Sequence, residues 1–399
     1  MSTPLPGYPA RKGDPATPAG VAYSQLRITQ PLSRVVLPSG HEAWLITRYD
    51  DVRAVLSDPR FSRSLFYPGA PCMMEPGDFS TGERSILNLD PPDHTRVRRL
   101  AAKAFTARRI EGMRGRIEQI THELLDRMAA KRPPVDLIDE FAFLLPTAVI
   151  CELLGVPFED RERFRAWSSV IVAPMTYGMD AVAQAQRDGA EDMRRLIEIK
   201  RSRPGDDLLS ALIEARDNEA RLSEEELIDL ATQTLLAGHE TTVSLIATGV
   251  VLLMRHPDQL AALRADPTLI GPAVEEILRY DGPAEGSLLR VATADVELGG
   301  VRIRNGDAVV AMNSSANYDE RRFADPTRFD ITRRDNPHLG FGHGIHFCIG
   351  APLARLEGQI ALAALLDRFP GLRLAVPHKE IVWRPAMSVR GPAAVPITW

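Results

Sequence analysis

The sequence predicts a single, mainly α-helical domain with a minor β portion. Helical patterns fill about residues 95–280, and short β signals lie on either side of this body. Within it, the stretch from Glu226 to about Met254 stays apolar for about seven turns, or roughly 40 Å, which is enough to cross a domain. With 399 residues, of which 44% are hydrophobic, the chain can bury an ample core, and no linker or repeat divides it. We therefore expect one domain over residues 1–399, with a flexible N-terminal segment of about residues 1–20.

The predicted elements follow one another in a simple order. A hairpin comes first, over residues 34–46, around a Pro-Ser-Gly turn. After the helical body, further hairpins are predicted at residues 296–303 and around the Asn-Gly pair at 305–306. A loop-rich run then leads to a cysteine turn, one long helix to about residue 368 and a β-like tail.

Charge and cysteine usage exclude several classes of protein. A formal net charge of −5 argues against nucleic acid as the general partner. Cys72, Cys151 and Cys348 are widely separated and form no pair motif, as expected in a reducing cytoplasm. The first residues are rich in Pro, Gly and Ala and hold no apolar run, so we expect neither a secretory signal nor a membrane anchor. The long apolar stretch contains Asp, His and Glu, which argues against a membrane span.

The glycine-rich turn from Phe341 to Gly350 is the most informative segment. It places Cys348 just ahead of a helix that opens Ala351-Pro352, where proline suits the first turn. A thiol at a helix N-terminus lies near free N–H groups and the positive end of the dipole, which should lower its pKa and favour the thiolate. A persistent thiolate without a partner cysteine indicates a metal ligand.

Two other interpretations of this turn stay open on the residues alone. A lone cysteine is most often an inert buried side chain, although that would not require the surrounding glycines and histidines. His338, His343, His346 and Cys348 also crowd together as zinc ligands do, although structural zinc sites usually draw their ligands from two separated pairs.

Polar residues interrupt the long apolar stretch at Ala237-Gly238-His239-Glu240-Thr241. Glycine inside a helix costs about 1 kcal/mol relative to alanine, and a buried carboxylate or hydroxyl needs partners. Such penalties in the middle of a helix indicate a functional use. The alternative is a satisfied Glu and Thr that simply pack against a polar neighbour.

Both segments resemble motifs of the cytochrome P450 family. The turn matches the haem-ligand pattern Phe-Gly-x-Gly-x-His-x-Cys-x-Gly at every fixed position, and the helix segment matches Ala/Gly-Gly-x-Asp/Glu-Thr. The resemblance covers essentially the whole chain and implies the cytochrome P450 fold, with the long central helix over a buried haem. It implies haem b (iron protoporphyrin IX) as cofactor, with the Cys348 thiolate as the iron ligand.

The resemblance also implies roles for further residues. Gly238 would make room for dioxygen in a locally opened helix, Thr241 would hold a water and hydrogen-bond the oxygen bound at the iron, and Glu240 would relay protons. Ala237 and Gly350 are expected beside the haem. The two haem propionates need cations or donors, and the residues at the family-equivalent positions are His94, Arg98, Arg290 and His346. Each of these four, taken alone, could be an ordinary surface cation.

A Glu-x-x-Arg motif lies at the end of the helical body, at Glu276 and Arg279. In the family this pair locks the core together with an arginine from the later loop, for which Arg328 is the candidate. We expect a structural and not a catalytic role, while the alternative is a minor pair on a helix surface.

The chain contains no flavin or dinucleotide fingerprint and no cysteine set for an iron–sulfur cluster. A separate reductant is therefore implied, which in the family is a ferredoxin with an NAD(P)H-dependent ferredoxin reductase. The residues expected to steer it are basic: Arg98, Arg99, Lys103, Arg108, Arg109 and Arg355. A solvated helix face without a special role is the alternative.

Within the family, the chain looks most like soluble actinobacterial enzymes that tailor macrolides and other secondary metabolites. The expected function is a monooxygenase that inserts one oxygen atom from O2, by hydroxylation or epoxidation, into a hydrophobic secondary metabolite such as a macrolide or other polyketide. Oxidative coupling or ring formation on a peptide or aromatic product is the alternative within the family. A haem-thiolate sensor is the alternative from a different class.

The substrate must be read from variable segments. Those expected to line the cavity are residues 66–87, 169–179, 235–236, 284–289 and 386–389. The first two hold adaptable apolar side chains suited to a bulky substrate, namely Met73, Met74, Pro174, Met175 and Met179. Glu285 is an exception, which could pair with a cationic amine or sugar on the substrate, or with a scaffold cation such as Arg279.

Overall fold

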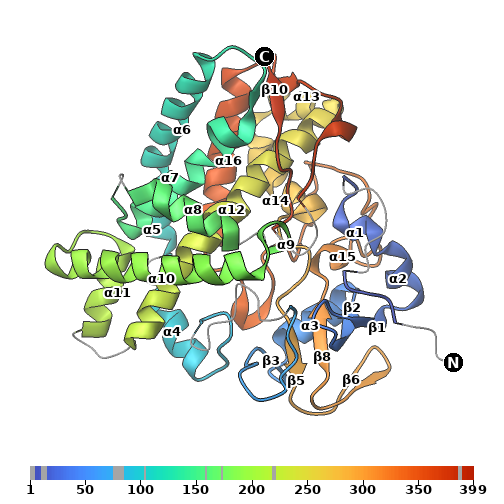
Figure 1. Cartoon of the computed structure of the whole chain (residues 1–399). Coiled ribbons are helices and arrows are strands. Elements are labelled where there is room, and N and C mark those ends of the chain that lie inside the picture. Colours follow the sequence, from blue (N-terminus) through green and yellow to red (C-terminus); the bar gives the residue numbers. More distant parts are fainter. Residues whose placement is uncertain are drawn as a thin grey trace.

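The computed structural model describes residues 5–9, 16–74, 85–102, 105–157, 160–171, 174–217, 222–384 and 389–399. It confirms the mainly helical fold with a minor β portion: helices form most of the molecule, and a small sheet lies at the lower right of Figure 1.

The helical body predicted for about residues 95–280 is confirmed. Its α-helices are α4 (Asp93–Ala102), α5 (Ala107–Gly112), α6 (Arg114–Ala129), α7 (Leu144–Leu154), α8 (Arg161–Ile171), α9 (Pro174–Tyr177), α10 (Met179–Ser202), α11 (Leu208–Asp217), α12 (Glu224–Arg255), α13 (Pro257–Ala265) and α14 (Ile270–Asp281). After the cysteine turn, α16 (Ala351–Arg368) ends at the predicted residue.

The long apolar stretch forms α12, the central helix. It begins with a capping box in which the Ser223 hydroxyl accepts the N–H of Glu226 and the Glu226 carboxylate accepts the N–H of Ser223. α7, α10, α14 and α16 all pack against it. α12 is long and apolar enough to cross a membrane, but 83% of its most apolar window is buried, so it is the core helix of this fold.

The larger sheet has the strand order β1-β2-β8-β5-β3. Its strands are β1 (Leu32–Val36), β2 (Glu42–Ile46), β3 (Phe61–Ser62), β5 (Arg290–Ala292) and β8 (Ala308–Ala311), with β2 and β8 parallel and the other pairs antiparallel. The β1–β2 hairpin and the hairpin of β6 (Val296–Leu298) with β7 (Val301–Ile303) are confirmed. The hairpin predicted around residues 305–306 is wrong, because β7 and β8 belong to different sheets.

The predicted β-like tail is a strand of a second, three-stranded sheet. There β10 (Pro396–Thr398) lies between β4 (Val135–Asp136) and β9 (Arg373–Leu374), which ties the C-terminus to the helical part. The C-terminal end lies at the top of Figure 1, far from the larger sheet.

Part of the segment that we expected to be flexible has a defined place. The Tyr8 N–H donates to the Val36 carbonyl at 2.7 Å, and the Val36 N–H donates to the Pro6 carbonyl at 3.0 Å, so residues 5–9 lie along β1. Helices α1 (Ala19–Ala22) and α2 (Ser24–Thr29) follow, and Tyr23 between them is fully buried. Residues 1–4 and 10–15 lie outside the described part.

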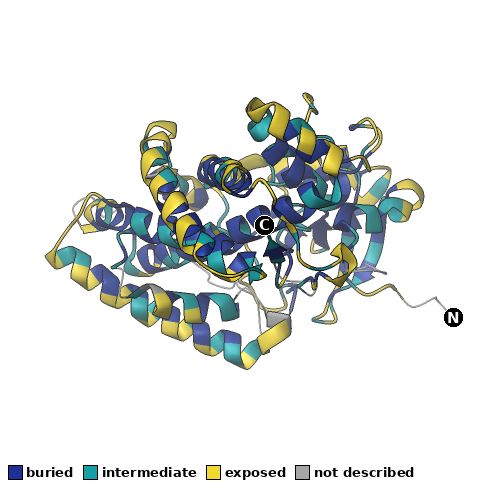
Figure 2. Ribbon diagram, turned by 90° about the horizontal axis from the view of Figure 1, so that it is seen from above, coloured by how far each residue is buried: buried dark blue, intermediate teal, exposed yellow. Residues whose placement is uncertain are grey.

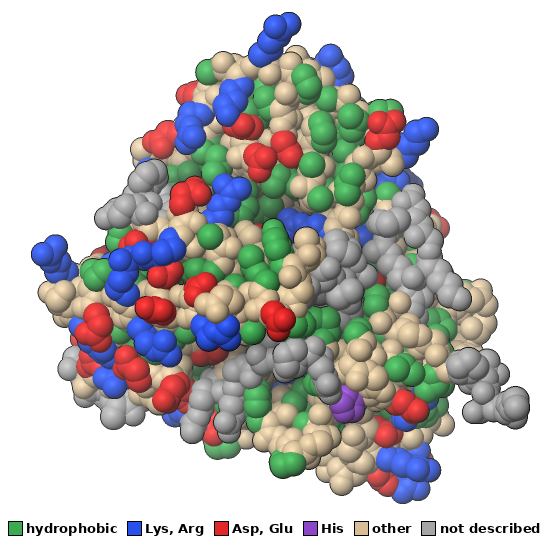
Figure 3. Space-filling view, viewed as in Figure 1, with side chains coloured by type: hydrophobic (Ala, Val, Ile, Leu, Met, Phe, Trp, Pro, Cys, Tyr) green, Lys and Arg blue, Asp and Glu red, His purple; other side chains and the backbone are tan. Residues whose placement is uncertain are grey.

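Buried side chains fill the interior, and exposed residues follow the outer faces of the helices (Figure 2). One large cluster joins α6, α7, α12, α14 and α16, and two smaller clusters cover the two faces of the larger sheet with help from α3 (Tyr49–Ser57). On the face that carries α10 and α11, acidic and basic side chains are interspersed (Figure 3). This face therefore shows no broad basic field of the kind that nucleic-acid binding requires.

Candidate active site

A cavity of about 360 Å³ opens between the middle of α12 and the cysteine turn. Its walls come from segments far apart in the sequence: α4, α7, α12, the end of α14, residues 283–290 and the start of α16. Apolar side chains predominate, including Ile86, Ile150, Leu230, Leu245 and Leu288. Such a mainly apolar, pre-formed cavity with a few convergent polar groups is typical of cofactor and ligand sites.

The cysteine turn folds tightly onto the sheet side of the cavity. The Cys348 N–H donates to the Phe341 carbonyl at 3.0 Å, and the Phe347 N–H donates to the Gly344 carbonyl at 3.0 Å. Gly344 has φ +73°, and a Cβ there would collide with the Leu56 carbonyl oxygen, so only glycine fits. The turn therefore presents Cys348 on the cavity wall, next to Gly350.

The expectation of a low pKa for the Cys348 thiol is wrong for the protein alone. Burial raises the pKa, and this outweighs the lowering by the Gly350 and Ala351 N–H groups and by Arg98 and Arg355. A coordinated metal ion deprotonates a thiol outright. The N–H groups at the helix N-terminus thus lower the pKa of the thiol, but they are not sufficient on their own to make it a thiolate.

The histidines near the cysteine do not form a zinc cluster. His338 Nε2 lies 3.0 Å from Glu275 Oε2, while its Nδ1 accepts the Gly340 N–H at 3.1 Å. Arg355 completes this contact with two hydrogen bonds to Glu275, at 2.7 and 2.8 Å. Within the described ranges, no group of three His, Cys, Asp or Glu side chains could hold a metal ion. The zinc interpretation is therefore rejected.

The four residues predicted for the propionates come together at one end of the cavity. The His94 and His346 rings lie 4.4 Å apart between centroids, and all four residues line the cavity. Arg98 donates to the Phe347 carbonyl at 2.5 Å, and Arg290 donates to the Phe61 carbonyl at 2.9 Å. Arg290 is desolvated enough to lower its pKa to about 10.

These residues fit two carboxylates of a haem. His94 Nε2, His346 Nε2 and Arg290 Nε are buried and have no hydrogen-bond partner in the described protein, which is costly unless a ligand supplies one. Burial lowers the pKa of His346 to about 2, with His94 and the surrounding arginines adding to the shift. An anionic group would relieve this excess of positive charge.

Sequence reasoning missed one further arginine at this end of the cavity. Arg63 follows β3, is 2% exposed and also lines the cavity. It donates to the carbonyls of Leu87 and Leu289 and, at 2.5 Å, to Asn88 Oδ1. The Arg63 side chain thereby joins three segments around the cavity. A lone Arg after a short strand carries no sequence signal for this position.

The middle of α12 forms the wall opposite the cysteine turn. Ala237, Gly238 and Thr241 line the cavity, and the Thr241 hydroxyl donates to the Ala237 carbonyl at 2.8 Å. The locally opened helix that we expected is not present, because α12 is α-helical throughout. Gly238 has a packing reason of its own: a Cβ would stand 2.5 Å from Cδ1 of Ile150 on α7.

Glu240 lies beside this wall and not on it. Its carboxylate is buried, with Oε2 accepting from Arg384 at 2.7 Å and Oε1 3.7 Å from His239 Nε2. His239 in turn contacts the Leu235 carbonyl at 2.8 Å and the Ser168 hydroxyl of α8 at 3.2 Å. Arg384, whose side chain is 17% exposed, is the link from Glu240 toward solvent.

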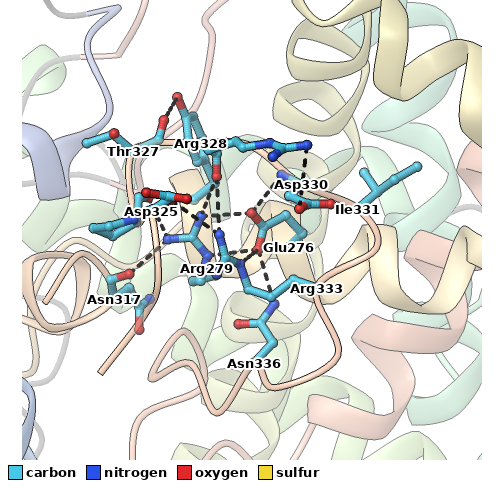
Figure 4. A network of polar contacts seen from close by, with 12 residues as sticks. Glu276, Arg279, Asn317, Asp325, Thr327, Arg328, Asp330, Ile331, Arg333 and Asn336 are labelled. Carbon is cyan, nitrogen blue, oxygen red and sulfur yellow. Dashed lines mark hydrogen bonds and ion pairs between the residues drawn. The ribbon is translucent and has the colours of Figure 1, made fainter. Parts of the chain in front are cut away.

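The Glu-x-x-Arg pair is fully buried, with hydrogen bonds of 2.7 and 2.8 Å between Glu276 and Arg279 (Figure 4). Arg279 also donates to the carbonyls of Asn317, Pro326 and Arg328. The assignment of the Arg328 side chain is wrong, because it is 65% exposed and points away from the pair. Arg333 supplies the third charge, 3.3 Å from Glu276.

Only some of the segments that were predicted to line the cavity do so. Ala284, Gly286, Ser287 and Leu288 line the cavity, as expected. Leu235 and Leu236 do not, because they are buried in the helical core, where Gln233 and Thr234 take the cavity side. Met73 and Met74 are also wrong, because they pack into the cluster against the sheet. Residues 75–84, 172–173 and 385–388, and the side chains of 174–175, lie outside the described part.

Glu285 is turned away from the cavity. Tyr23 donates to its Oε1 at 3.2 Å, and the Ser314 N–H donates to its backbone carbonyl at 3.0 Å. Tyr8 approaches from the same side: its hydroxyl lies 3.1 Å from where a Cβ on Gly286 would stand. The N-terminal segment therefore backs the stretch that lines the cavity. This arrangement contradicts a substrate contact for Glu285.

The basic residues that were expected to steer a reductant differ in exposure and in their partners. Arg99 and Arg108 are exposed, whereas Arg98 turns inward and Arg355 is held by Glu275. Arg109 lies 3.8 Å from Asp206, and Lys103 lies outside the described residues.

Together, the cysteine turn, the opposed α12 wall and the basic end of the cavity define a haem-thiolate enzyme. The family model for cytochrome P450 matches residues 29–380, and the chain belongs to this family. It is 46% identical to the mycinamicin IV hydroxylase/epoxidase of Micromonospora griseorubida over 393 residues, covering 98% of each chain. It is 48% identical to the cytochrome P450 monooxygenase PikC of Streptomyces venezuelae over 379 residues, covering 94% of this chain and 90% of that one.

A solved structure agrees with this assignment. The LnmA cytochrome P450 hydroxylase of the leinamycin pathway of Streptomyces atroolivaceus superimposes with a TM-score of 0.87 at 44% identity, covering 100% of this chain and 99% of that one. The chain is thus a cytochrome P450 monooxygenase, an oxidoreductase whose cofactor is haem b with a cysteine thiolate ligand.

Proposed function

We propose that this enzyme inserts one oxygen atom into a hydrophobic polyketide, such as a macrolide. The observation that carries the proposal is the large apolar cavity between the Cys348 turn and the Thr241 wall of α12. Relatives named for macrolide substrates share nearly the full length of the chain. An apolar wall with few polar groups orients a bulky substrate by shape and excludes water.

The haem, when bound, supplies the activation of dioxygen, and Cys348 would hold its iron. His94, Arg98, Arg290 and His346 would bind the propionates, because the unpartnered nitrogens of His94, His346 and Arg290 converge with the positive charge of the two arginines at one end of the cavity. Ala237, Gly238 and Gly350 would lie against the cofactor.

Proton delivery would involve two residues of α12. Thr241 would present its hydroxyl at the cavity wall, where it can hold a water molecule. Glu240 would exchange protons with solvent water beside the partly exposed Arg384, since their ion pair places the buried carboxylate next to a residue that reaches the surface. Because Glu240 faces Arg384 and not the cavity, a side-chain rotation or a water molecule must complete the path.

Electrons would come from a separate ferredoxin and its NAD(P)H-dependent reductase in the cytoplasm. Among the described residues of the stretch expected to meet an acidic ferredoxin, Arg99 and Arg108 are exposed. Their contribution would fall with rising salt, because exposed charges are screened within about 10 Å at 0.1 M ionic strength.

The test is an absorption titration of the purified ferric holoprotein with mycinamicin IV, other polyketides, terpenoids and cyclic peptides. A low- to high-spin shift with a polyketide supports the proposed substrate class. A shift with another class alone overturns that class but keeps the enzyme type. Reaction under labelled dioxygen then separates insertion from oxidative coupling, because only insertion leaves the label in the product.

A further inference from the structure

Three side chains beside the cysteine turn have no role in the function proposed above. Glu275 of α14 accepts two hydrogen bonds from Arg355 of α16, at 2.7 and 2.8 Å, and one from His338 Nε2 at 3.0 Å. Side-chain exposure is 2% for His338, 27% for Glu275 and 33% for Arg355. These three residues, which we call the Glu275 triad, join α14, α16 and the loop that leads to Cys348.

The triad holds one positive and one negative charge. Burial alone would raise the pKa of Glu275, but the hydrogen bonds from His338 and Arg355 lower it to about 2, so the carboxylate is ionised at neutral pH. His338 is neutral, because its Nδ1 accepts the Gly340 N–H at 3.1 Å and only Nε2 then carries a proton. Within the triad, the charge of Arg355 is therefore balanced by Glu275.

The triad contacts the cysteine turn at two points. His338 fixes the backbone at Gly340, one residue before Phe341, whose carbonyl accepts the Cys348 N–H at 3.0 Å. The guanidinium carbon of Arg355 lies 4.6 Å from the centre of the Phe341 ring. Burial raises the pKa of the Cys348 thiol, and Arg355 is one of the groups that oppose this shift. The field of Arg355 therefore reaches the sulfur that would hold the iron.

We propose that Glu275 lowers the reduction potential of the bound haem iron, because its carboxylate balances the charge of Arg355 beside the Cys348 thiolate. Reduction by one electron adds negative charge at the iron and its ligand, and a nearby positive charge favours this. Groups around a metal ligand commonly tune potentials in this way. Glu275 acts through Arg355 and is a positioning residue. The inference concerns electron supply and does not depend on the substrate class.

The test is a spectroelectrochemical titration of the substrate-free holoprotein, which gives the ratio of ferrous to ferric iron at a fixed potential. Glu275→Gln leaves Arg355 unbalanced and should raise this ratio several-fold. Arg355→Gln leaves Glu275 unbalanced and should lower it several-fold. The double variant, which lacks both charges, and Arg355→Lys, which keeps the positive charge, should both stay close to wild type. Both shifts should shrink as salt is added, because the pair is partly exposed.

An ion pair elsewhere on α16 provides the matched control. Asp126 lies 3.1 Å from Arg368, the last residue of this helix, and Asp126→Asn should leave the ratio unchanged. A merely structural role for the triad would move the ratio in the same direction in Glu275→Gln and Arg355→Gln, or in neither. Either result overturns the proposal, and so does an equal shift in Asp126→Asn.

Two further readouts keep the outcomes apart. Unchanged haem content and an unchanged CO-difference spectrum show that the thiolate still binds the iron in each variant. If Glu275→Gln does not retain haem, the lower ratio in Arg355→Gln and its return in Arg355→Lys decide the proposal. A polyketide titration that gives no spin shift would overturn the proposed substrate class and leave this inference intact, because the potential is measured without substrate.

Discussion

Gly238→Ala should destabilise the protein because of Ile150 and not because of oxygen binding. The new Cβ would stand 2.5 Å from Ile150 Cδ1 and 2.7 Å from its Cγ1, and the Ile150 side chain is 2% exposed and enclosed by the core. Overpacking of this kind costs about 1–3 kcal/mol, whereas alanine in place of glycine inside a helix gains about 1 kcal/mol. The difference is a net loss of up to about 2 kcal/mol.

The double mutant tests this reasoning. Ile150→Ala removes both clashing carbons and alone costs about 2–5 kcal/mol. In that background, Gly238→Ala should become stabilising by about 1 kcal/mol, because only the helix-propensity gain remains. Urea unfolding of the four ferric holoproteins gives the coupling energy. The reasoning fails if Gly238→Ala is equally harmful with and without the Ile150 side chain, because the clash with Ile150 would then not be the cause.

Three further predictions address pH, the core and the cofactor. Burial raises the pKa of Asp229 to about 6. Its contribution to the free energy of unfolding is therefore present at acidic pH and is lost as the pH rises from about 4 to 6. In urea unfolding, the stability of Asp229→Asn should therefore change less over this pH range than that of the wild type, by up to about 3 kcal/mol. In the same assay, Glu276→Gln should lower the free energy of unfolding by about 3–5 kcal/mol. The exposed control Arg328→Ala should change it by less than about 0.5 kcal/mol. An equal effect of the two substitutions would contradict the geometry in Figure 4. Arg290→Leu should lower haem retention during gel filtration while Cys348 still gives a thiolate spectrum, and full retention would argue against a propionate contact.

Much of the fold was predictable because its signals are local. The seven-turn apolar stretch and the hairpin at residues 34–46 depend on neighbours in the sequence, and each was found in place. The hairpin around residues 305–306 failed because an Asn-Gly turn does not say which strands pair. β8 instead pairs with β5, across the intervening β6–β7 hairpin, and with β2, which the sequence places far away.

The candidate site shows the same division. Motif residues such as Cys348 and His346 were found together, since their spacing fixes a common turn. The sequence did not reveal which partner each side chain faces. Glu240 faces Arg384, and Glu285 faces Tyr23. Beside Glu276, Arg333 takes the place expected for Arg328. Each of these contacts joins residues at least 50 positions apart in the sequence. Helix periodicity says nothing about such pairs, because tertiary packing decides which side chains meet.

The position of the N-terminal segment has a practical consequence for changing substrate choice. Tyr8 and Tyr23 stand behind Glu285 and Gly286, so they form the outer layer of a wall whose inner layer lines the cavity. Exchanging Tyr8 and Tyr23 for the residues of relatives would shift that wall without altering any residue that lines the cavity. Libraries built on these N-terminal residues would therefore reshape the cavity while leaving Cys348, Thr241 and the basic end of the cavity unchanged.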